Sequence, residues 1–353
     1  MEYFYDAIDL LKGMISRPSF SQEEADVADF LQSQWEKAGH RVDRKENNLW
    51  ITAPGFDASR PTILMNSHID TVRPVASWKK DPFVPEEGDD CLYGLGSNDA
   101  GASVVALYEA FVLLNAKKQP YNLIFLASAE EETSGQNGVE CVLSELPPIA
   151  FGLVGEPTGM HPAVAEKGLL VLDCISRGIS GHAARHEGLN AISEAIKDIQ
   201  WFHTFTFPRQ SDLLGPVKMT TTMIKAGTQH NVIPDNCGFT VDVRINELYS
   251  TMELFEEIRK HVACEVITHD LRLNSSQIDP QHPFVRRAVM LGKTPFGSPT
   301  LSDQALMNFP TVKMGPGESS RSHTADEFIR PSEIREAIEL YVRLLDGLNL
   351  IES

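Results

Sequence analysis

The chain has 353 residues, enough for two domains, and its hydrophobic (42%) and charged (23%) fractions are those of an ordinary globular protein. A net charge of −18 argues against nucleic acid and anionic lipid as partners, because an acidic surface repels phosphate groups. The N-terminus is acidic, and no apolar run is long enough to cross a membrane. We therefore expect a cytoplasmic protein with no membrane span.

The first part of the chain alternates predicted helices and strands. Ser21-Gln-Glu-Glu24 is a capping-box pattern, which predicts a helix that starts here and stops at Gly39. Apolar runs then predict strands at 62–67, 122–128 and 151–155, and a buried helix at 101–114. This alternation is typical of an α/β fold with a mostly parallel sheet.

A different pattern begins near Leu169. Strand, helix, strand, strand and helix are predicted at 170–176, 190–202, 217–224, 239–245 and 252–262. This order is typical of a small two-layer α+β domain. An amphipathic helix at 332–348 ends the chain. It follows His323, a candidate metal ligand, so the last segment should return to the first domain. We therefore expect a discontinuous catalytic domain (1–168 and 280–353) with an inserted lid and dimerisation domain (169–279).

Five apolar runs lead to side chains that can bind a divalent metal. These side chains are His68 with Asp70, Asp99, the run Glu130–Glu132, Glu156, and His323. In an open α/β sheet, ligands bind outside the carboxyl ends of the strands, so these groups should meet there. Histidine nitrogen and carboxylate oxygen are zinc ligands, and an open coordination position gives a catalytic site.

A two-metal hydrolytic site holds its ions about 3.5–4 Å apart and needs a bridging ligand. Asp99 is the natural bridge, because a short carboxylate at a strand-to-helix turn is held rigidly. His68 and Asp70 can share a face at the end of their strand, since strand side chains alternate. Asp70 is therefore expected to accept the second ring N–H of His68 and to fix its tautomer.

These motifs, in this order, resemble one known family. They are His68-Ile-Asp70, Tyr93-Gly-Leu-Gly-Ser-Asn-Asp99, Glu130-Glu-Glu132, Gly155-Glu-Pro-Thr158 and His323-Thr-Ala-Asp-Glu-Phe328. Over essentially the whole chain they resemble the M20 metallopeptidase superfamily, and within it the acetylornithine deacetylases and succinyl-diaminopimelate desuccinylases.

The resemblance implies two divalent ions, with Zn²⁺ expected and Co²⁺ or Mn²⁺ as alternatives. It places His68, Asp99 and Glu156 on one ion, and Asp99, Glu132 and His323 on the other. It also makes Glu131 the general base. Three consecutive glutamates leave a second register open, in which Glu130 is the base.

Residues of the inserted domain are expected to contact the substrate. His182 on its own suggests a polar turn, but the resemblance makes it an oxyanion donor that acts across a homodimer. Arg244 is expected to clamp a substrate carboxylate, or else to pair with Asp242 or Asp235. Asn231 would orient the same substrate, and the loop around Gly317 could cradle its α-carboxylate with backbone N–H groups.

The expected reaction is hydrolysis of an amide bond between a small acyl group and the α-nitrogen of an amino acid. Metal lowers the pKa of water, and Glu131 moves the proton. The first choice of substrate is acylornithine or acylcitrulline, in arginine biosynthesis. Succinyl-diaminopimelate and dipeptides are alternatives. A non-catalytic binding relative is a further alternative, but such proteins normally lose ligands or the base, and all of them are present here.

Overall fold

The computed structural model describes residues 2–185 and 187–350, with side chains from Asp6 onward. The chain divides into two compact units. Unit 1 comprises residues 1–164, 277–296 and 302–353, and unit 2 comprises residues 165–276 and 297–301. The predicted insertion, 169–279, therefore begins and ends a few residues too late. It also omits 297–301, a segment that joins unit 2 because the Ser298 carbonyl accepts the Lys167 N–H at 3.0 Å.

Unit 1 contains most of a nine-stranded sheet in the order β1-β2-β6-β3-β7-β17-β8-β15, with β16 paired to β8. Strands β8, β15 and β16 cross the boundary, with some of their residues in unit 2. The strands are β1 (Asp43–Lys45), β2 (Asn48–Thr52), β3 (Thr62–His68), β6 (Asn122–Ser128), β7 (Phe151–Val154), β8 (Ala163–Glu166), β15 (Ser276–Gln277), β16 (Phe296–Ser298) and β17 (Thr311–Lys313). The four central strands β6, β3, β7 and β17 run parallel, with antiparallel β2 and β8 beside them. The predicted α/β fold with a mostly parallel sheet is confirmed.

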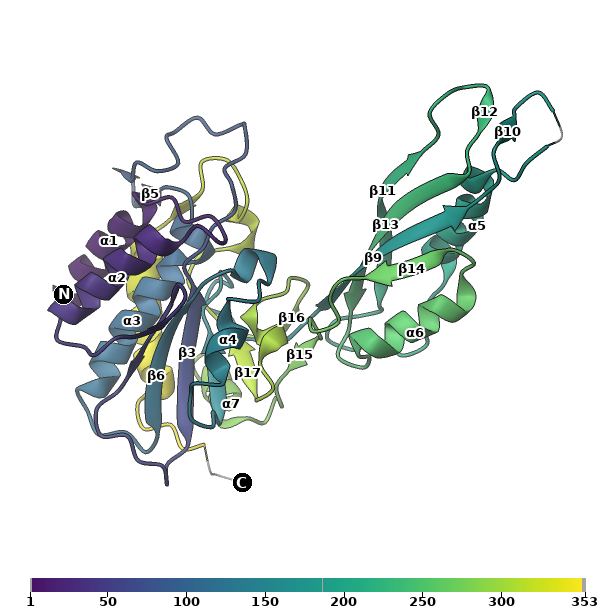
Figure 1. Cartoon of the computed structure of the whole chain (residues 1–353). Coiled ribbons are helices and arrows are strands. Elements are labelled where there is room, and N and C mark those ends of the chain that lie inside the picture. The colour runs from purple at the N-terminus through teal and green to yellow at the C-terminus, as the bar shows by residue number, and fades with distance from the viewer. Residues whose placement is uncertain (1, 186, 351–353) are drawn as a thin grey trace. The chain divides into compact units, whose positions relative to one another are not determined.

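Helices cover both faces of this sheet (Figure 1). One face packs against α1 (Glu2–Ile15), α2 (Ala25–Lys37), α3 (Ala102–Asn115), α7 (Pro283–Met290) and α8 (Pro331–Leu345), and the other against α4 (Val139–Leu143). Alternation along β3 explains this, because Ile63 and Met65 enter the first core and Leu64 enters the second. No helix in the described part of the chain is long and apolar enough to cross a membrane.

The predicted capping box at the start of α2 is wrong. The helix begins at Ala25, and Ser21 does not cap it. The Ser21 hydroxyl donates instead to the Asp70 carboxylate at 2.7 Å, and Glu24 accepts the Gln22 N–H at 2.6 Å. The helix does stop at Gly39, whose φ of +90° suits glycine.

The apolar run before Asp99 is not a strand of the central sheet. Only Cys91–Tyr93 (β5) is extended, and it pairs with β4 (Glu86–Gly88) and β18 (Phe328–Ile329) in a separate three-stranded sheet. Asp99 itself lies in a short kinked turn, η1 (Ser97–Gly101), directly before α3, and its own backbone is not helical (φ −124°, ψ 95°). Four of the five predicted ligand-bearing segments therefore follow central parallel strands, and Asp99 reaches the site from a turn.

Unit 2 is a two-layer α+β unit. Its antiparallel sheet has the order β11-β13-β9-β14, formed by β9 (Gly168–Arg177), β11 (Lys218–Ala226), β13 (Asn236–Ile245) and β14 (Glu265–Thr268). The helices α5 (Ala191–Thr204) and α6 (Thr251–His261) share one core with the sheet. A short ladder also pairs β10 (Gly181–His182) with β12 (Val232–Ile233).

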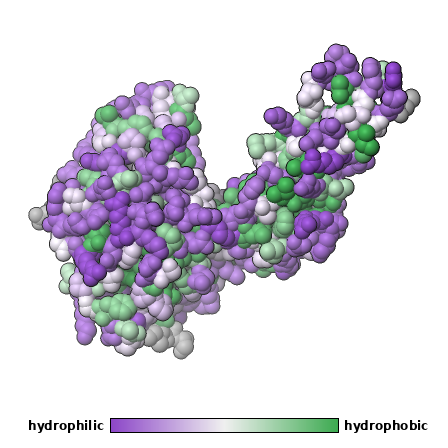
Figure 2. Space-filling view, in the orientation of Figure 1, coloured by the Kyte–Doolittle hydropathy of each residue, from purple (hydrophilic) through white to green (hydrophobic). Residues whose placement is uncertain are grey.

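The edge strand β11 exposes apolar side chains. Met223 is 62% exposed and Ile224 is 57% exposed. Figure 2 shows hydrophobic surface on unit 2 among hydrophilic residues.

Candidate metal centre

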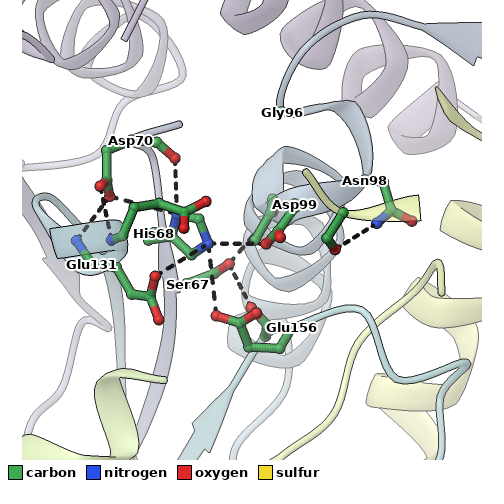
Figure 3. A network of polar contacts seen from close by, with 12 residues as sticks. Ser67, His68, Asp70, Gly96, Asn98, Asp99, Glu131 and Glu156 are labelled. Carbon is green, nitrogen blue, oxygen red and sulfur yellow. Dashed lines mark hydrogen bonds and ion pairs between the residues drawn. The ribbon is translucent and has the colours of Figure 1, made fainter. Parts of the chain in front are cut away.

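His68 lies at the end of β3 and points its Nε2 atom at a group of carboxylates (Figure 3). The nearest carboxylate oxygens belong to Asp99 (3.3 Å), Glu156 (3.7 Å) and Glu131 (4.0 Å). The other ring nitrogen, Nδ1, donates to the backbone carbonyl of Asp70 at 2.9 Å. Because a carbonyl only accepts, Nδ1 carries a proton, which leaves Nε2 as the ring atom that a metal would bind. Burial alone would lower the pKa of His68, but the surrounding carboxylates outweigh burial and raise it.

The tautomer of His68 is therefore set by the main chain of Asp70 more than by its carboxylate, whose Oδ1 lies 3.5 Å away. The prediction that the Asp70 side chain accepts this N–H needs that correction. The carboxylate instead accepts the backbone N–H of Glu131 at 3.0 Å and of Glu132 at 3.1 Å. Burial alone would raise the pKa of Asp70, but the close approach and charge of His68, with the hydrogen bonds from Ser21 and the Glu132 N–H, outweigh burial and lower it.

The three glutamates after β6 point in different directions. Glu130 has a positive φ of 56°, which turns the chain, and its carboxylate accepts the backbone and side-chain N–H groups of Asn137 at 3.2 and 3.1 Å. This contact requires glycine at position 135, since a Cβ there would lie 1.8 Å from Glu130 Oε2. The carboxylates of Glu131 and Glu132 are the two that reach the candidate metal ligands.

His323 completes the second half of the cluster. It follows β17 through a loop and the short helical turn η4 (Ser319–Arg321). Its Nε2 lies 3.0 Å from a Glu132 oxygen and 3.6 Å from Asp99 Oδ2. Asp99 therefore turns Oδ1 toward His68 and Oδ2 toward His323, as a bridging carboxylate must. The hydrogen bond to Glu132 raises the pKa of His323 to about 9.

The charges of this cluster fit divalent cations. Burial raises the pKa of Glu131 and of Glu132, and it raises that of Glu156 to about 8. The neighbouring carboxylates, which carry like charge, raise all three further. One Glu156 oxygen, Oε1, is buried without a hydrogen-bond partner. Ligand atoms of His68, Glu131 and Glu156 lie within 4.8 Å of one another, as do those of His68, Asp99 and Glu132. A buried unpaired oxygen among carboxylates and imidazoles suits a metal better than bare protein.

Two further buried carboxylates, which the sequence did not place at the metal centre, hold segments beside it. The Glu327 carboxylate, 2% exposed, accepts the backbone N–H groups of Gly96, Asn98 and Asp99 at 3.1, 2.8 and 2.9 Å. Its place in the His323 motif was visible, but its partners lie more than 200 residues away in the sequence.

Asp303 is the second such carboxylate, and it lies in the short helical turn η3 (Asp303–Leu306). It accepts hydrogen bonds from Asn66 (2.8 Å) and Ser128 (2.6 Å), and burial raises its pKa to about 6. These contacts join the ends of β3 and β6 close to His68, the last residue of β3.

The other predicted contact residues have local partners. Exposed His182 accepts the Ala184 N–H on Nδ1 at 3.1 Å, and Arg244 binds Asp242 with both arms of its guanidinium group at 2.9 and 3.0 Å. Asn231 is exposed, and its backbone carbonyl accepts the Ala183 N–H at 3.0 Å. Gly317, in unit 1, is buried with φ of +80°, and a Cβ there would lie 2.2 Å from Asn98 Oδ1.

Most of the chain, including every candidate metal ligand, lies within a match to a known protein family. Residues 64–347 match Peptidase family M20/M25/M40. The chain belongs to this family. It is accordingly a metal-dependent hydrolase of the peptidase and amidohydrolase type, as the resemblance in its motifs predicted.

Two curated relatives that match along nearly their whole length carry the same name. The chain is 25% identical to the succinyl-diaminopimelate desuccinylase of Ehrlichia ruminantium (strain Gardel), over 96% of this chain and 97% of the relative. It is 27% identical to the enzyme of that name from Stenotrophomonas maltophilia (strain K279a), over 97% and 98%.

Solved structures show the same fold. A tripeptidase from Staphylococcus aureus superposes with a TM-score of 0.78 at 19% identity, covering 97% of this chain and 98% of that one. A dinuclear metal-binding M20 peptidase from Bacillus subtilis superposes with a TM-score of 0.75 at 17% identity, covering 98% of each chain.

Proposed function

We propose that this protein hydrolyses the amide bond of an N-succinyl amino acid, with N-succinyl-diaminopimelate as the first substrate to test. The observation that carries the proposal is the meeting of five candidate ligands with the Glu131 carboxylate at one end of the sheet. The two curated relatives described above, both named for removal of a succinyl group, support the acyl choice.

Two divalent ions, proposed as Zn²⁺, suit the donor set of imidazole and carboxylate groups. His68, Asp99 and Glu156 would hold one ion, and Asp99, Glu132 and His323 the other. When bound, the ions would lower the pKa of water, and their positive charge would polarise the substrate carbonyl. Cobalt and manganese accept the same donors.

Glu131 is the proposed general base. Its carboxylate reaches the cluster beside His68, while its backbone is held by Asp70. It accepts a proton from the attacking water and delivers that proton to the nitrogen of the leaving amine. Burial raises the pKa of Glu131, and a base with a raised pKa holds a proton better at neutral pH. The contacts of Glu130 with Asn137 support this register over the shifted one.

The amino acid part of the substrate has three candidates. The relatives favour diaminopimelate over ornithine or citrulline, which were the first choice from the sequence. The motifs, which also resemble acetylornithine deacetylases, keep the arginine-pathway substrates in the comparison. Arg244 is a candidate clamp for a substrate carboxylate if Asp242 releases it, with Asn231 and the Gly317 loop as further contacts.

We also propose a homodimer formed through unit 2, with the edge strand β11 in the contact. Its exposed Met223 and Ile224 support this, since pairing of edge strands would cover them. In such a dimer His182 would serve the partner subunit. Because its Nδ1 accepts the Ala184 N–H, Nε2 carries the proton and is free to donate to a developing oxyanion.

One experiment tests the reaction and the acyl group together. The chelated enzyme is reloaded with zinc, cobalt or manganese and assayed on matched pairs of N-succinyl and N-acetyl diaminopimelate, ornithine and citrulline, and on a dipeptide. We expect the highest kcat/KM on a succinyl substrate. Faster cleavage of acetyl substrates or of the dipeptide would overturn the acyl assignment. Lack of any hydrolysis by enzyme carrying two ions would overturn the reaction itself.

A further inference from the structure

A cavity of about 610 Å³ lies among α1, α2 and α3 of unit 1, lined by residues separate from the metal ligands. Its wall includes Asp6, Asp9, Trp35, His40, Tyr108 and Glu109. The three helices lie side by side on one face of the sheet (Figure 1). Small-molecule sites usually have volumes of about 300–1,000 Å³, so this cavity is large enough for one.

Glu109 is the unusual group in this wall. It lies in the middle of α3, is 5% exposed, and has no hydrogen bond to any residue that the structure describes. A buried carboxylate without a donor is costly, and native proteins rarely keep one without a reason. Burial raises its pKa to about 7, with a further rise from the nearby charge of Asp6. A positively charged ligand group would remove this cost.

The rest of the wall also favours a cation. Asp6 and Asp9 add negative charge, and His40 is the basic side chain among the lining residues. Burial lowers the pKa of His40, so it is neutral at neutral pH. Trp35 and Tyr108 stack with their ring centroids 5.3 Å apart, and aromatic faces attract organic cations.

We propose that this cavity binds a small organic cation, a primary ammonium group carried on an apolar body, with its nitrogen at the Glu109 carboxylate. The aromatic and aliphatic wall would contact the apolar body. Binding of the cation here does not depend on the hydrolytic reaction. The cavity and the metal centre share one element, α3, which begins directly after the turn that carries Asp99.

The test compares two probes of one shape and different charge, benzylammonium and benzyl alcohol. Binding to the zinc-loaded full chain is measured by calorimetry at about pH 8, above the pKa of Glu109. We expect benzylammonium to bind at least about tenfold more tightly than the alcohol. Glu109→Gln, which keeps the shape of the side chain, should abolish that preference while leaving the alcohol affinity unchanged.

Glu339→Gln is the matched control, because it removes the same charge from an exposed position on α8. It should leave both affinities as they are. Val112→Phe, which adds volume at the cavity wall, should weaken both probes. Equal affinity for the two probes in the wild-type chain, or full benzylammonium affinity in Glu109→Gln, would overturn the proposal. The second result would place the amine elsewhere, including at the metal centre.

Discussion

The Glu327 carboxylate accepts a hydrogen bond from the backbone N–H of Asp99 at 2.9 Å. The same oxygen accepts the Asn98 N–H, and the other oxygen accepts that of Gly96. Glu327 lies four residues after His323, so one buried side chain joins the loop of one ligand to the turn of another. Since Asp99 faces both histidines, this contact bears on both halves of the metal centre.

Glu327→Gln should loosen the Asp99 turn. An amide presents one carbonyl oxygen in place of two carboxylate oxygens, and its NH₂ group faces backbone donors. Loss of a group that orients a metal ligand typically costs about 10–100-fold in metal affinity or activity. We expect losses of that size in zinc affinity, measured against a competing chelator, and in kcat. Glu336→Gln, which removes the same charge from an exposed position on α8, is the control. Unchanged zinc affinity and turnover in Glu327→Gln would rule out the positioning role.

The register of the glutamates predicts opposite outcomes for neighbouring substitutions. Glu131→Gln should keep both ions and lose about 10²–10⁴ in kcat, because proton transfer is removed. Glu130→Gln should keep most of the turnover, since its side chain binds Asn137. Metal content by elemental analysis and kcat are measured on both variants. If Glu130→Gln keeps its metal but loses as much turnover as Glu131→Gln, then Glu130 is the base.

Much of the fold and site could be predicted because it depends on local pattern. Apolar runs of strand length placed β3, β6 and β7 within a residue, and ligands at strand ends followed from the parallel sheet. The run before Asp99 misled, because apolar residues also fill a turn and a second small sheet. Ser21 and Glu24 matched a helix cap but found better partners in Asp70 and Glu130, across the fold. Glu327 was missed for the same reason. A sequence shows which groups can accept hydrogen bonds, and the tertiary structure decides which donors reach them.

The buried carboxyl of Glu109 predicts a pH dependence of stability. In the unfolded chain a glutamate ionises near its ordinary pKa of 4.5, whereas folded Glu109 keeps its proton up to a pKa of about 7. Between these values the folded state binds more protons, so the free energy of unfolding falls as pH rises. The loss is complete above pH 7 and amounts to about 3 kcal/mol. The other titratable groups that line this cavity are the Asp6 and Asp9 carboxylates, neutral His40 and Tyr108, whose pKa burial raises.

Glu109→Gln should therefore match the wild type below about pH 4.5 and exceed its stability by up to about 3 kcal/mol at about pH 8. Urea unfolding of both proteins across this range measures the difference. Glu339→Gln, as a control, should follow the wild-type profile. A constant difference between Glu109→Gln and the wild type at every pH would contradict the titration of Glu109 in this range.

The proposed dimer can be tested at the edge strand of unit 2. Met223→Lys places a charge on β11, and a buried unpaired charge disfavours association. We expect this variant to sediment as a monomer, with its zinc content unchanged. Met252→Lys is the matched control, because Met252 is an equally polarisable, 51% exposed methionine on α6 of the same unit. A wild-type chain that sediments as a monomer at assay concentrations would end the dimer proposal.

If the dimer forms, the role of His182 across it makes a sharper prediction. His182→Ala should lose about 10²–10³ in kcat, the usual cost of an oxyanion donor, and Glu131→Gln is inactive for its own reason. Mixed and allowed to exchange subunits, the two variants form heterodimers in which one active site contains both Glu131 and the partner's His182. Random exchange should restore about a quarter of wild-type activity, since half of the dimers carry one intact site of two. Recovery of no activity, with exchange verified by differently tagged subunits, would show that His182 does not act across the interface.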